Sequence, residues 1–357
     1  MVREEDLAAS TLGEVLKSAS ICAVPRSGRI LFLHANAAAL HGIDLEESTC
    51  TCVQNLRPLA DTLQASGREV HAHPPHSATG IDLVLALPPR QREQARICLA
   101  RAVAAVRAGG HVIVAMANRE GAKSIERDLR DLAGPLQVRS LNKCRVFGGA
   151  FEARHIRHDK LQAWLALDAL RPVADDGWVS RPGLFAWDRI DPASALLAAH
   201  IPTRLEGRLA DLGAGFGYLS AMAVQACPGL TSIDLYEADA RALEAARVNM
   251  QRACEAAHRD VSFDVHWHDV TRGLPGRYDA VISNPPFHQG RIERPELGRA
   301  FIHAAADALH PGGELWMVAN RHLPYEDVLR ARFTRVHTVE QRDGYKVISA
   351  ERGHAHG

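Results

Sequence analysis

The sequence predicts an α/β fold with two tandem domains, and three observations lead to this prediction. The chain has 357 residues, which is about twice the length of an ordinary domain. Its second half alternates apolar strand patterns with helical patterns, and two distant stretches repeat one order of elements. Alternating strands and helices form parallel sheets that are covered on both faces. We therefore expect two Rossmann-like domains that arose by duplication.

The elements of the second half follow from apolar runs and their flanking residues. Short apolar runs that end in glycine, proline or acidic residues are typical of buried strands, and longer Ala-rich runs are typical of helices. In order along the chain we expect a strand in 207–217, a helix in 219–227, a strand in 231–239, a helix in 240–257, a strand in 261–269 and a strand in 277–287.

A repeat relates Gly80–Gly121 to Arg277–Leu323. Both stretches show an Asp, an apolar strand, Pro-Pro, a helix, Gly-Gly, a second apolar strand and Ala-Asn-Arg. Duplication explains this shared order better than chance does. The first copy has "LALPPR" where the second has "ISNPPF", and it lacks a glycine-rich loop, so we expect it to be degenerate. The expected organisation is a degenerate domain at 1–155, a linker at 156–182, an active domain at 183–350 and a tail at 351–357.

Composition excludes several classes of protein. Hydrophobic residues make up 46% and charged residues 24% of the chain, as in globular proteins, and no apolar run approaches the roughly 20 residues of a membrane span. The first residues lack the apolar segment of a signal peptide, so we expect a cytoplasmic protein. Seven scattered cysteines indicate free thiols, and the His71, His73, His76 and Cys50, Cys52 groups lack the spacing of a structural zinc site, so no metal is expected.

The segment "LADLGAGFG" predicts a ligand-binding turn. Asp211 ends a strand, and Gly213, Gly215 and Gly217 lead into the next helix. Glycine permits unusual dihedrals there and lets a ligand approach the backbone, although a tight turn without a ligand would use the same residues. Two cofactors fit, a dinucleotide and a nucleoside sulfonium. An acidic strand end suits a cation and disfavours a phosphate, and the spacing is similar to the S-adenosylmethionine loop of Rossmann-like methyltransferases.

Acidic residues end the next two strands. Glu237 has the usual place of a carboxylate that binds two ribose hydroxyls, or else it caps the following helix, a role that Asp239 also fits. Asp269 follows a further strand and is placed to accept an adenine amine. Taken together with the glycine loop, these residues describe a nucleoside site at the carboxyl edge of a parallel sheet.

The segment "ISNPPFHQG" predicts a second site beside the first. A residue before proline is held extended, and proline has a fixed φ and no N–H, so Asn284 is constrained. Its side-chain oxygen and the carbonyl of Pro285 can accept both N–H groups of one amine. Two acceptors would localise the lone pair of a base amine, and Phe287 would stack on the base. Proximity and orientation then suffice for methyl transfer from a sulfonium to nitrogen. A rigid turn with a buried Phe is the alternative.

With "DLGAGFG", "ISNPPFHQG", "LHPGGELWMVANRHLPY" and "GYKV", the segment from Gly183 to Val347 resembles the RsmC family of ribosomal RNA guanine-N2 methyltransferases. The resemblance implies methylation of guanine N2 in 16S rRNA of the small subunit, with a degenerate N-terminal methyltransferase-like domain and S-adenosyl-L-methionine as cofactor. It implies that Asp211, Gly213 and Gly215 line the methionine side of the cofactor. In the same way, Glu237 would contact the ribose and Asp269 the adenine, and Asn284, Pro285 and Phe287 would hold the guanine. Ala214 stands where the family often has Cys.

The target base must be unpaired or flipped, which predicts a basic approach surface. Arg291, Arg294, Arg299 and Lys346 are candidates for phosphate contacts, with solvated surface charge as the alternative. Other functions stay open at this point: a guanine-N2 methyltransferase of 23S rRNA, an adenine or glutamine methyltransferase, a non-catalytic ribosome-assembly factor, and a nicotinamide dehydrogenase.

Overall fold

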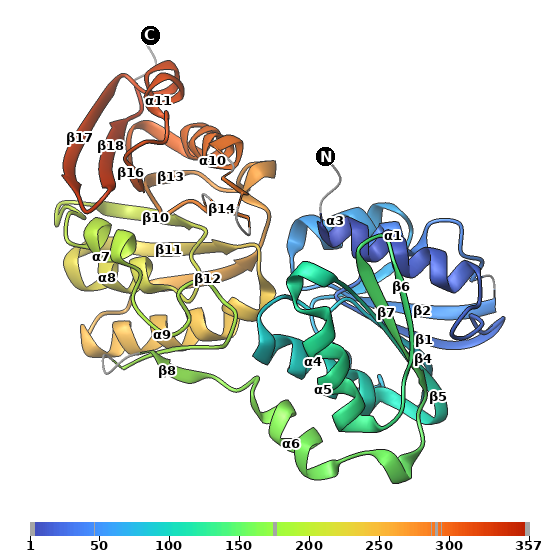
Figure 1. Ribbon diagram of the computed structural model, residues 1–357. Coiled ribbons are helices and arrows are strands. Elements are labelled where there is room, and N and C mark those ends of the chain that lie inside the picture. Colours follow the sequence, from blue (N-terminus) through green and yellow to red (C-terminus); the bar gives the residue numbers. More distant parts are fainter. Residues whose placement is uncertain are drawn as a thin grey trace. The chain divides into compact units, whose positions relative to one another are not determined.

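The computed structural model describes residues 4–45, 47–173, 177–286, 288–289, 292–293 and 295–353 (Figure 1). The chain divides into two compact units, Met1–Ala169 and Leu170–Gly357. Each unit is built on one seven-stranded sheet with helices packed against it. The predicted α/β class and the two tandem domains are therefore confirmed.

The N-terminal unit has the strand order β3-β2-β1-β4-β5-β7-β6, in which β7 runs antiparallel to both of its neighbours. Its strands are β1 (Ser27–Leu33), β2 (Glu47–Val53), β3 (Glu69–His71), β4 (Ile81–Ala86), β5 (Val106–Ala117), β6 (Gln137–Leu141) and β7 (Cys144–Ala150). Its helices are α1 (Glu4–Lys17), α2 (Ala37–Leu40), α3 (Arg57–Ala65), α4 (Arg92–Ala105), α5 (Ala122–Ala133) and α6 (His158–Ala166), with 3-10 turns η1 (Asn118–Glu120) and η2 (Ala153–His155).

The C-terminal unit has the order β12-β11-β10-β13-β16-β18-β17. Its main strands are β10 (Glu206–Leu212), β11 (Gly229–Glu237), β12 (Ser262–Trp267), β13 (Tyr278–Ser283), β16 (Leu309–Asn320), β17 (Arg335–Arg342) and β18 (Tyr345–Glu351), and the short pairs are β8 (Arg171–Val173) with β9 (Trp178–Ser180) and β14 (His288–Gln289) with β15 (Ile292–Glu293). Its helices are α7 (Pro192–Ala198), α8 (Tyr218–Ala226), α9 (Leu243–Ala256), α10 (Pro295–Ala308) and α11 (Glu326–Arg332), with 3-10 turns η3 (Ala240–Ala242) and η4 (Val270–Arg272).

The two sheets have the same topology, strand for strand, which confirms the duplication inferred from the repeat. One contact recurs at the same place in both. The Asp82 carboxylate accepts the backbone N–H of Arg29 at 2.8 Å, and Asp279 accepts that of Arg208 at 2.8 Å. Each Asp lies on the strand next to the one that carries the Arg, so the contact joins the first and fourth strands of each copy.

Two apolar layers enclose the C-terminal sheet. One contains side chains of α7, α8 and α9, and the other contains side chains of α10 and α11. Figure 1 shows these two sets of helices on opposite faces of the sheet. The strands between them are buried on both faces, which explains their continuous apolar sequences.

The segment 156–182, expected as a linker, contributes to both units. Leu161 and Trp164 of α6 are buried in the core of the N-terminal unit. The backbone of Val179 in β9 exchanges hydrogen bonds with the Asn249 side chain of α9, at 2.9 Å and 2.8 Å. Within the described part of the chain, no helix combines the length and apolarity needed to cross a bilayer.

Candidate functional site

The predicted site residues meet at one edge of the C-terminal sheet. Leu212, the last residue of β10, pairs with Tyr236 of β11 on one side and with Ser283 of β13 on the other. Parallel strands in this register end at the same level, so the residues that end or follow them are neighbours. At this edge lie Gly213, Glu237, Asp269 and Asn284.

The glycine loop leaves room for a ligand. Gly213 and Gly215 have φ angles of +75° and +55°, which L side chains rarely adopt. The N–H of Gly213 donates to the carbonyl of Tyr236 at 2.9 Å, which ties the loop to β11. A Cβ placed on Gly215 would meet no heavy atom within 4 Å. The sequence prediction that a ligand can approach the backbone here is consistent with this open space.

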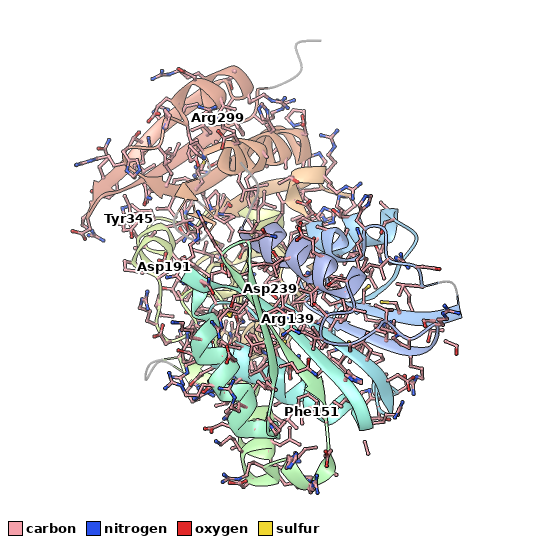
Figure 2. All side chains as sticks on the ribbon, turned by 45° about the vertical axis from the view of Figure 1, so that its right-hand side comes forward. Arg139, Phe151, Asp191, Asp239, Arg299 and Tyr345 are labelled. Atoms are coloured by element: carbon pink, nitrogen blue, oxygen red, sulfur yellow. The ribbon has the colours of Figure 1, made fainter. Side chains whose placement is uncertain are left out.

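Glu237 is tied to the glycine loop through its carboxylate. One oxygen accepts the backbone N–H of Gly215 at 2.8 Å, and the other accepts that of Asp239 at 2.8 Å. Burial raises the pKa of this carboxyl. The capping role belongs to Asp239 (labelled in Figure 2), whose side chain accepts the N–H of Arg241 at 3.1 Å. Glu237 therefore organises the loop and does not cap the following turn.

Asp211 is fully buried, with 0% of its surface exposed. One carboxylate oxygen accepts the Ser220 hydroxyl at 2.7 Å, while the other has no hydrogen-bond partner among the described residues. Burial raises the pKa of this carboxyl to about 7. A buried acceptor without a donor costs about 1–3 kcal/mol. The open oxygen therefore suits a donor, and a cationic one above all, that arrives with a ligand.

The Asn284 side chain is held in one orientation. Its Nδ2 donates to Oδ2 of Asp191 at 2.9 Å and to Oγ of Ser194 at 2.8 Å. A carboxylate has no proton to donate, so the group facing Asp191 must be the NH₂. The carbonyl oxygen, Oδ1, is buried and has no partner among the described residues. Among the described residues, Asn284 thus presents an acceptor without a donor directly after β13.

Asp191 and Ser194 are residues that the sequence reading missed. Asp191 caps α7 by accepting the backbone N–H of Ser194 at 2.9 Å, and Pro192 occupies the first turn (Figure 2). The segment "DPAS" is a recognisable helix start, because Asp is a favoured N-cap and proline is favoured directly after it. That signal predicts the helix but not the contact with Asn284.

Asp269 ends the series of strand-end acids. Its Oδ1 accepts the backbone N–H of Thr271 at 3.0 Å and the Thr271 hydroxyl at 2.7 Å, so it caps the short turn after β12. Pro285 is buried directly beyond Asn284. The predicted base-stacking residue, Phe287, lies outside the described residues.

The basic residues near the site differ in their surroundings. Arg299 on α10 is exposed, as a phosphate contact requires (Figure 2). Lys346 is only 3% exposed, donates to the carbonyl of Leu323 at 2.8 Å and forms an ion pair with Glu326. Its prediction as a candidate phosphate contact is therefore wrong, because its ammonium is already satisfied inside the protein. The other two candidates, Arg291 and Arg294, lie outside the described residues.

No set of three or more His, Cys, Asp or Glu side chains in the described ranges is arranged to hold a metal ion. The chemistry of the edge is instead that of hydrogen-bond acceptors. Asp211 and Asn284 each present a buried oxygen that receives no donor from the described part of the chain, and the loop beside them is open at Gly215. Acceptors of this kind suit a cation or an amine and disfavour a phosphate.

The Rossmann-like sheet, the glycine loop and the Asn-Pro-Pro segment after β13 together define the class of this protein, a methyltransferase. Two family models match, "Methyltransferase small domain" at residues 177–349 and "Methyltransferase small domain N-terminal" at 36–166. The chain is 30% identical over 263 residues to "Ribosomal RNA small subunit methyltransferase C" of Escherichia coli O9:H4 (strain HS), covering 73% of each chain. The protein of the same description from Shigella sonnei (strain Ss046) matches equally, with 30% identity and 73% coverage. The chain therefore belongs to the small subunit methyltransferase C family.

A solved structure is similar over nearly the whole chain. It is the T. thermophilus 16S rRNA N2 G1207 methyltransferase (RsmC) in complex with AdoMet and guanosine. The similarity has a TM-score of 0.76 at 25% sequence identity and covers 96% of this chain and 92% of that one. Both copies of the duplicated fold are thus shared.

Proposed function

We propose that this protein methylates the exocyclic N2 of a guanine in 16S rRNA, with S-adenosyl-L-methionine (AdoMet) as methyl donor. Family membership supports the reaction, and the relative solved with AdoMet and guanosine supports the cofactor and the base. Within the site, the observation that carries the proposal is the free Oδ1 of Asn284. We place the reaction on the small ribosomal subunit or its precursor, in the cytoplasm.

Asn284 acts as the acceptor for the target amine. The N2 amine of guanine carries two N–H groups and is a poor nucleophile, because its lone pair is delocalised into the ring. An N–H···O bond to Oδ1 of Asn284 and another to the carbonyl of Pro285 would draw both hydrogens into fixed directions. The lone pair then points at the electrophile, and the proton leaves after the nitrogen has become cationic. Orientation and proximity supply most of the acceleration.

The residues of the cofactor side fit AdoMet by charge and by shape. AdoMet, when bound, supplies an electrophilic methyl group on a sulfonium. The open oxygen of buried Asp211 suits the ammonium of its methionine part, and the space beside Gly215 admits its chain. We propose that Glu237, the last residue of β11, contacts the ribose hydroxyls, and that Asp269, two residues beyond β12, contacts the adenine amine.

The base must leave its stack to reach Asn284. A guanine N2 within a duplex lies in the minor groove and cannot approach a strand end, so the target nucleotide must be unpaired or flipped. We propose that Phe287 stacks on the base face, because aromatic stacking fixes a base without regard to its hydrogen-bonding edge.

The test is transfer of labelled methyl from AdoMet to 30S subunits, 50S subunits and free rRNAs from a strain that lacks this gene. We expect label on guanine N2 of the 30S material or 16S rRNA. Asn284→Ala should abolish it, while Asn118→Ala, an exposed Asn of the N-terminal unit, should leave it unchanged. Label on 50S subunits alone would show that the substrate is the RNA of the large subunit and not 16S rRNA. Failure of the parent protein to label any of these RNAs despite tight AdoMet binding would refute the proposed reaction.

A further inference from the structure

The N-terminal unit carries a concentrated positive charge. The whole chain has no net charge, yet from Arg90 to Arg145 it has twelve Lys and Arg against five Asp and Glu. Several of these residues lie on α4, α5 and the start of β7, which together we name the basic face. The basic face comprises Arg92, Arg96, Lys123, Arg127, Arg130 and Arg145. We propose that it binds the phosphate backbone of the rRNA substrate, an inference that rests on the proposed function.

A buried carboxylate holds two of these arginines in place. Asp128 of α5 has a side chain only 8% exposed. It accepts from Arg92 Nη2 at 3.1 Å and from Arg96 Nε at 2.9 Å, both on α4. One negative charge therefore fixes two positive ones, so an excess of one charge stays at this point of the surface.

A second carboxylate repeats this arrangement one half-turn away on the same helix. Glu126, also 8% exposed, accepts from Arg130 of α5 at 2.7 Å and from Arg145 of β7 at 2.6 Å. Again two guanidinium groups share one acid. The two acids together link α4, α5 and β7 through their arginines.

Shared acids orient the arginines without satisfying them. A guanidinium has five N–H donors in a planar fork, and each of these contacts uses one or two. The side chains of Arg92 and Arg130 are still 58% and 48% exposed. Because these guanidinium groups are already oriented, they lose less side-chain entropy when they bind a phosphate. The hydrogen bonds that they form with phosphate are charge-assisted and therefore among the stronger ones.

Two further cations extend the basic face without any acid. Lys123 and Arg127 are exposed on α5, and the described part of the chain offers neither a hydrogen bond nor an ion pair to their side chains. They stand four residues apart, and Arg130 follows three residues later, so all three share one side of the helix. Like charges at this spacing destabilise a helix by a few tenths of a kcal/mol. A bound polyanion would offset this repulsion by neutralising the charges.

The second copy of the fold shows that the basic face is not a requirement of the architecture. Helix α11 follows β16 as α5 follows β5, yet it starts with Glu326 and Asp327. Lys346 has the strand position of Arg145, and it is buried against Glu326. The first turn of α5 carries a positive charge, and the first turn of α11 carries negative charges. The two copies nevertheless share one topology.

The composition of the basic face favours RNA over a protein partner. Protein interfaces have apolar or aromatic centres, whereas contacts to a nucleic-acid backbone are made by Arg and Lys. Among the described residues, the large exposed hydrophobic side chains are Phe185 and Val339, and both belong to the other unit. The basic face therefore offers charge and hydrogen bonds but no apolar anchor.

The experiment removes the two cations that have no partner in the described structure. Full-length Lys123→Gln/Arg127→Gln is compared with the parent protein for binding to labelled 16S rRNA fragments by fluorescence anisotropy over a series of salt concentrations. Arg154→Gln/Arg157→Gln removes the same charge from exposed residues of the same unit and serves as the control. We expect the Kd of the test variant to rise about tenfold and its salt slope to fall by roughly 1.4, about 0.7 for each phosphate contact to a single strand.

Other readouts separate binding from folding and from the reaction itself. The melting temperature, AdoMet affinity and methylation of free guanosine should match the parent, since Lys123 and Arg127 are exposed and belong to the unit that does not carry the candidate site. Equal RNA binding and salt slope in the test variant and the parent would overturn the inference, as would an equal loss in the control. Loss of binding to a poly-glutamate peptide with unchanged RNA binding would also overturn it. If the parent shows no methyl transfer at all, the proposed function fails, while the anisotropy result still decides the basic face.

Discussion

Asp191→Ala is expected to slow methyl transfer by releasing the Asn284 side chain. One oxygen of Asp191 accepts both the backbone N–H of Ser194 and Nδ2 of Asn284, each at 2.9 Å. Loss of the N-cap costs the fold about 1 kcal/mol. Without its hydrogen bond to the charged acceptor, the present orientation of the Asn284 side chain loses about 1.5–3 kcal/mol of stabilisation. At 1.36 kcal/mol per tenfold in rate, that is roughly a 10- to 100-fold loss, because the carboxamide can then turn its NH₂ toward the amine it should accept from.

Three companion variants separate orientation from stability. Asp191→Asn keeps an oxygen that can cap and accept, so its rate should stay within about threefold of the parent. Ser194→Ala removes a neutral acceptor 2.8 Å from Nδ2, which should cost about 2- to 10-fold. Gln91→Ala removes the cap of α4, an acceptor 2.7 Å from the Gln94 N–H, and should lower stability without changing the rate.

The assay is single-turnover transfer at saturating AdoMet, with AdoMet affinity and melting temperature measured on the same preparations. If Asp191→Ala melts earlier but transfers methyl at the rate of Gln91→Ala, Asp191 is only a helix cap. If Asp191→Asn is as slow as Asp191→Ala, the retained oxygen does not matter. Either result would refute the argument that Asp191 orients Asn284.

Three further substitutions test other parts of the structure. Burial raises the Asp211 pKa to about 7, so its contribution to ligand-free stability is present below about pH 4 and is lost as the pH rises through 7. Asp211→Asn should therefore raise the melting temperature more at pH 8 than at pH 5, and equal shifts in scanning fluorimetry would contradict this. Gly215 has a φ of +55° and lies beside open space, so Gly215→Ala should cost about 1 kcal/mol of stability. The same substitution should weaken AdoMet binding more than tenfold, as measured by calorimetry. An unchanged Kd would show that the cofactor binds elsewhere. Gly148→Ala puts a Cβ 1.9 Å from the carbonyl oxygen of Val112. This clash should lower the free energy of unfolding of the N-terminal unit by about 2–3 kcal/mol, as measured by denaturant titration. A change near zero would contradict the prediction.

The sequence predicts those parts of the site that depend on local signals. Glycines with special dihedrals, prolines and strand-end acids lie close to their structural elements, so Gly213, Glu237 and Asn284 could be assigned to one sheet edge. The partners of Asn284 could not, because Asp191 lies 93 residues earlier in the chain. Contacts between residues far apart in the chain also explain the wrong prediction for Lys346. Its burial beside Glu326 depends on how β18 packs on α11.

The two copies of the fold separate what the architecture needs from what a ligand needs. The Asp-to-Arg backbone contact of the first and fourth strands is present in both copies at 2.8 Å, so it belongs to the fold. At the strand end the copies differ. His34, with a φ of +52°, follows the first strand of the N-terminal unit where Gly213 follows that of the other unit.

Two residues further on, the N-terminal copy closes its own loop. Asn36 is 8% exposed and its side chain accepts the N–H of Ala38 at 2.9 Å, at the position where Gly215 leaves open space. Leu87 follows the fourth strand where Asn284 does in the second copy. The same topology thus forms with other residues at the positions of Gly215 and Asn284. In the C-terminal copy, Gly215 leaves open space and Oδ1 of Asn284 has no donor among the described residues, and both features agree with the cofactor and base proposed for this edge.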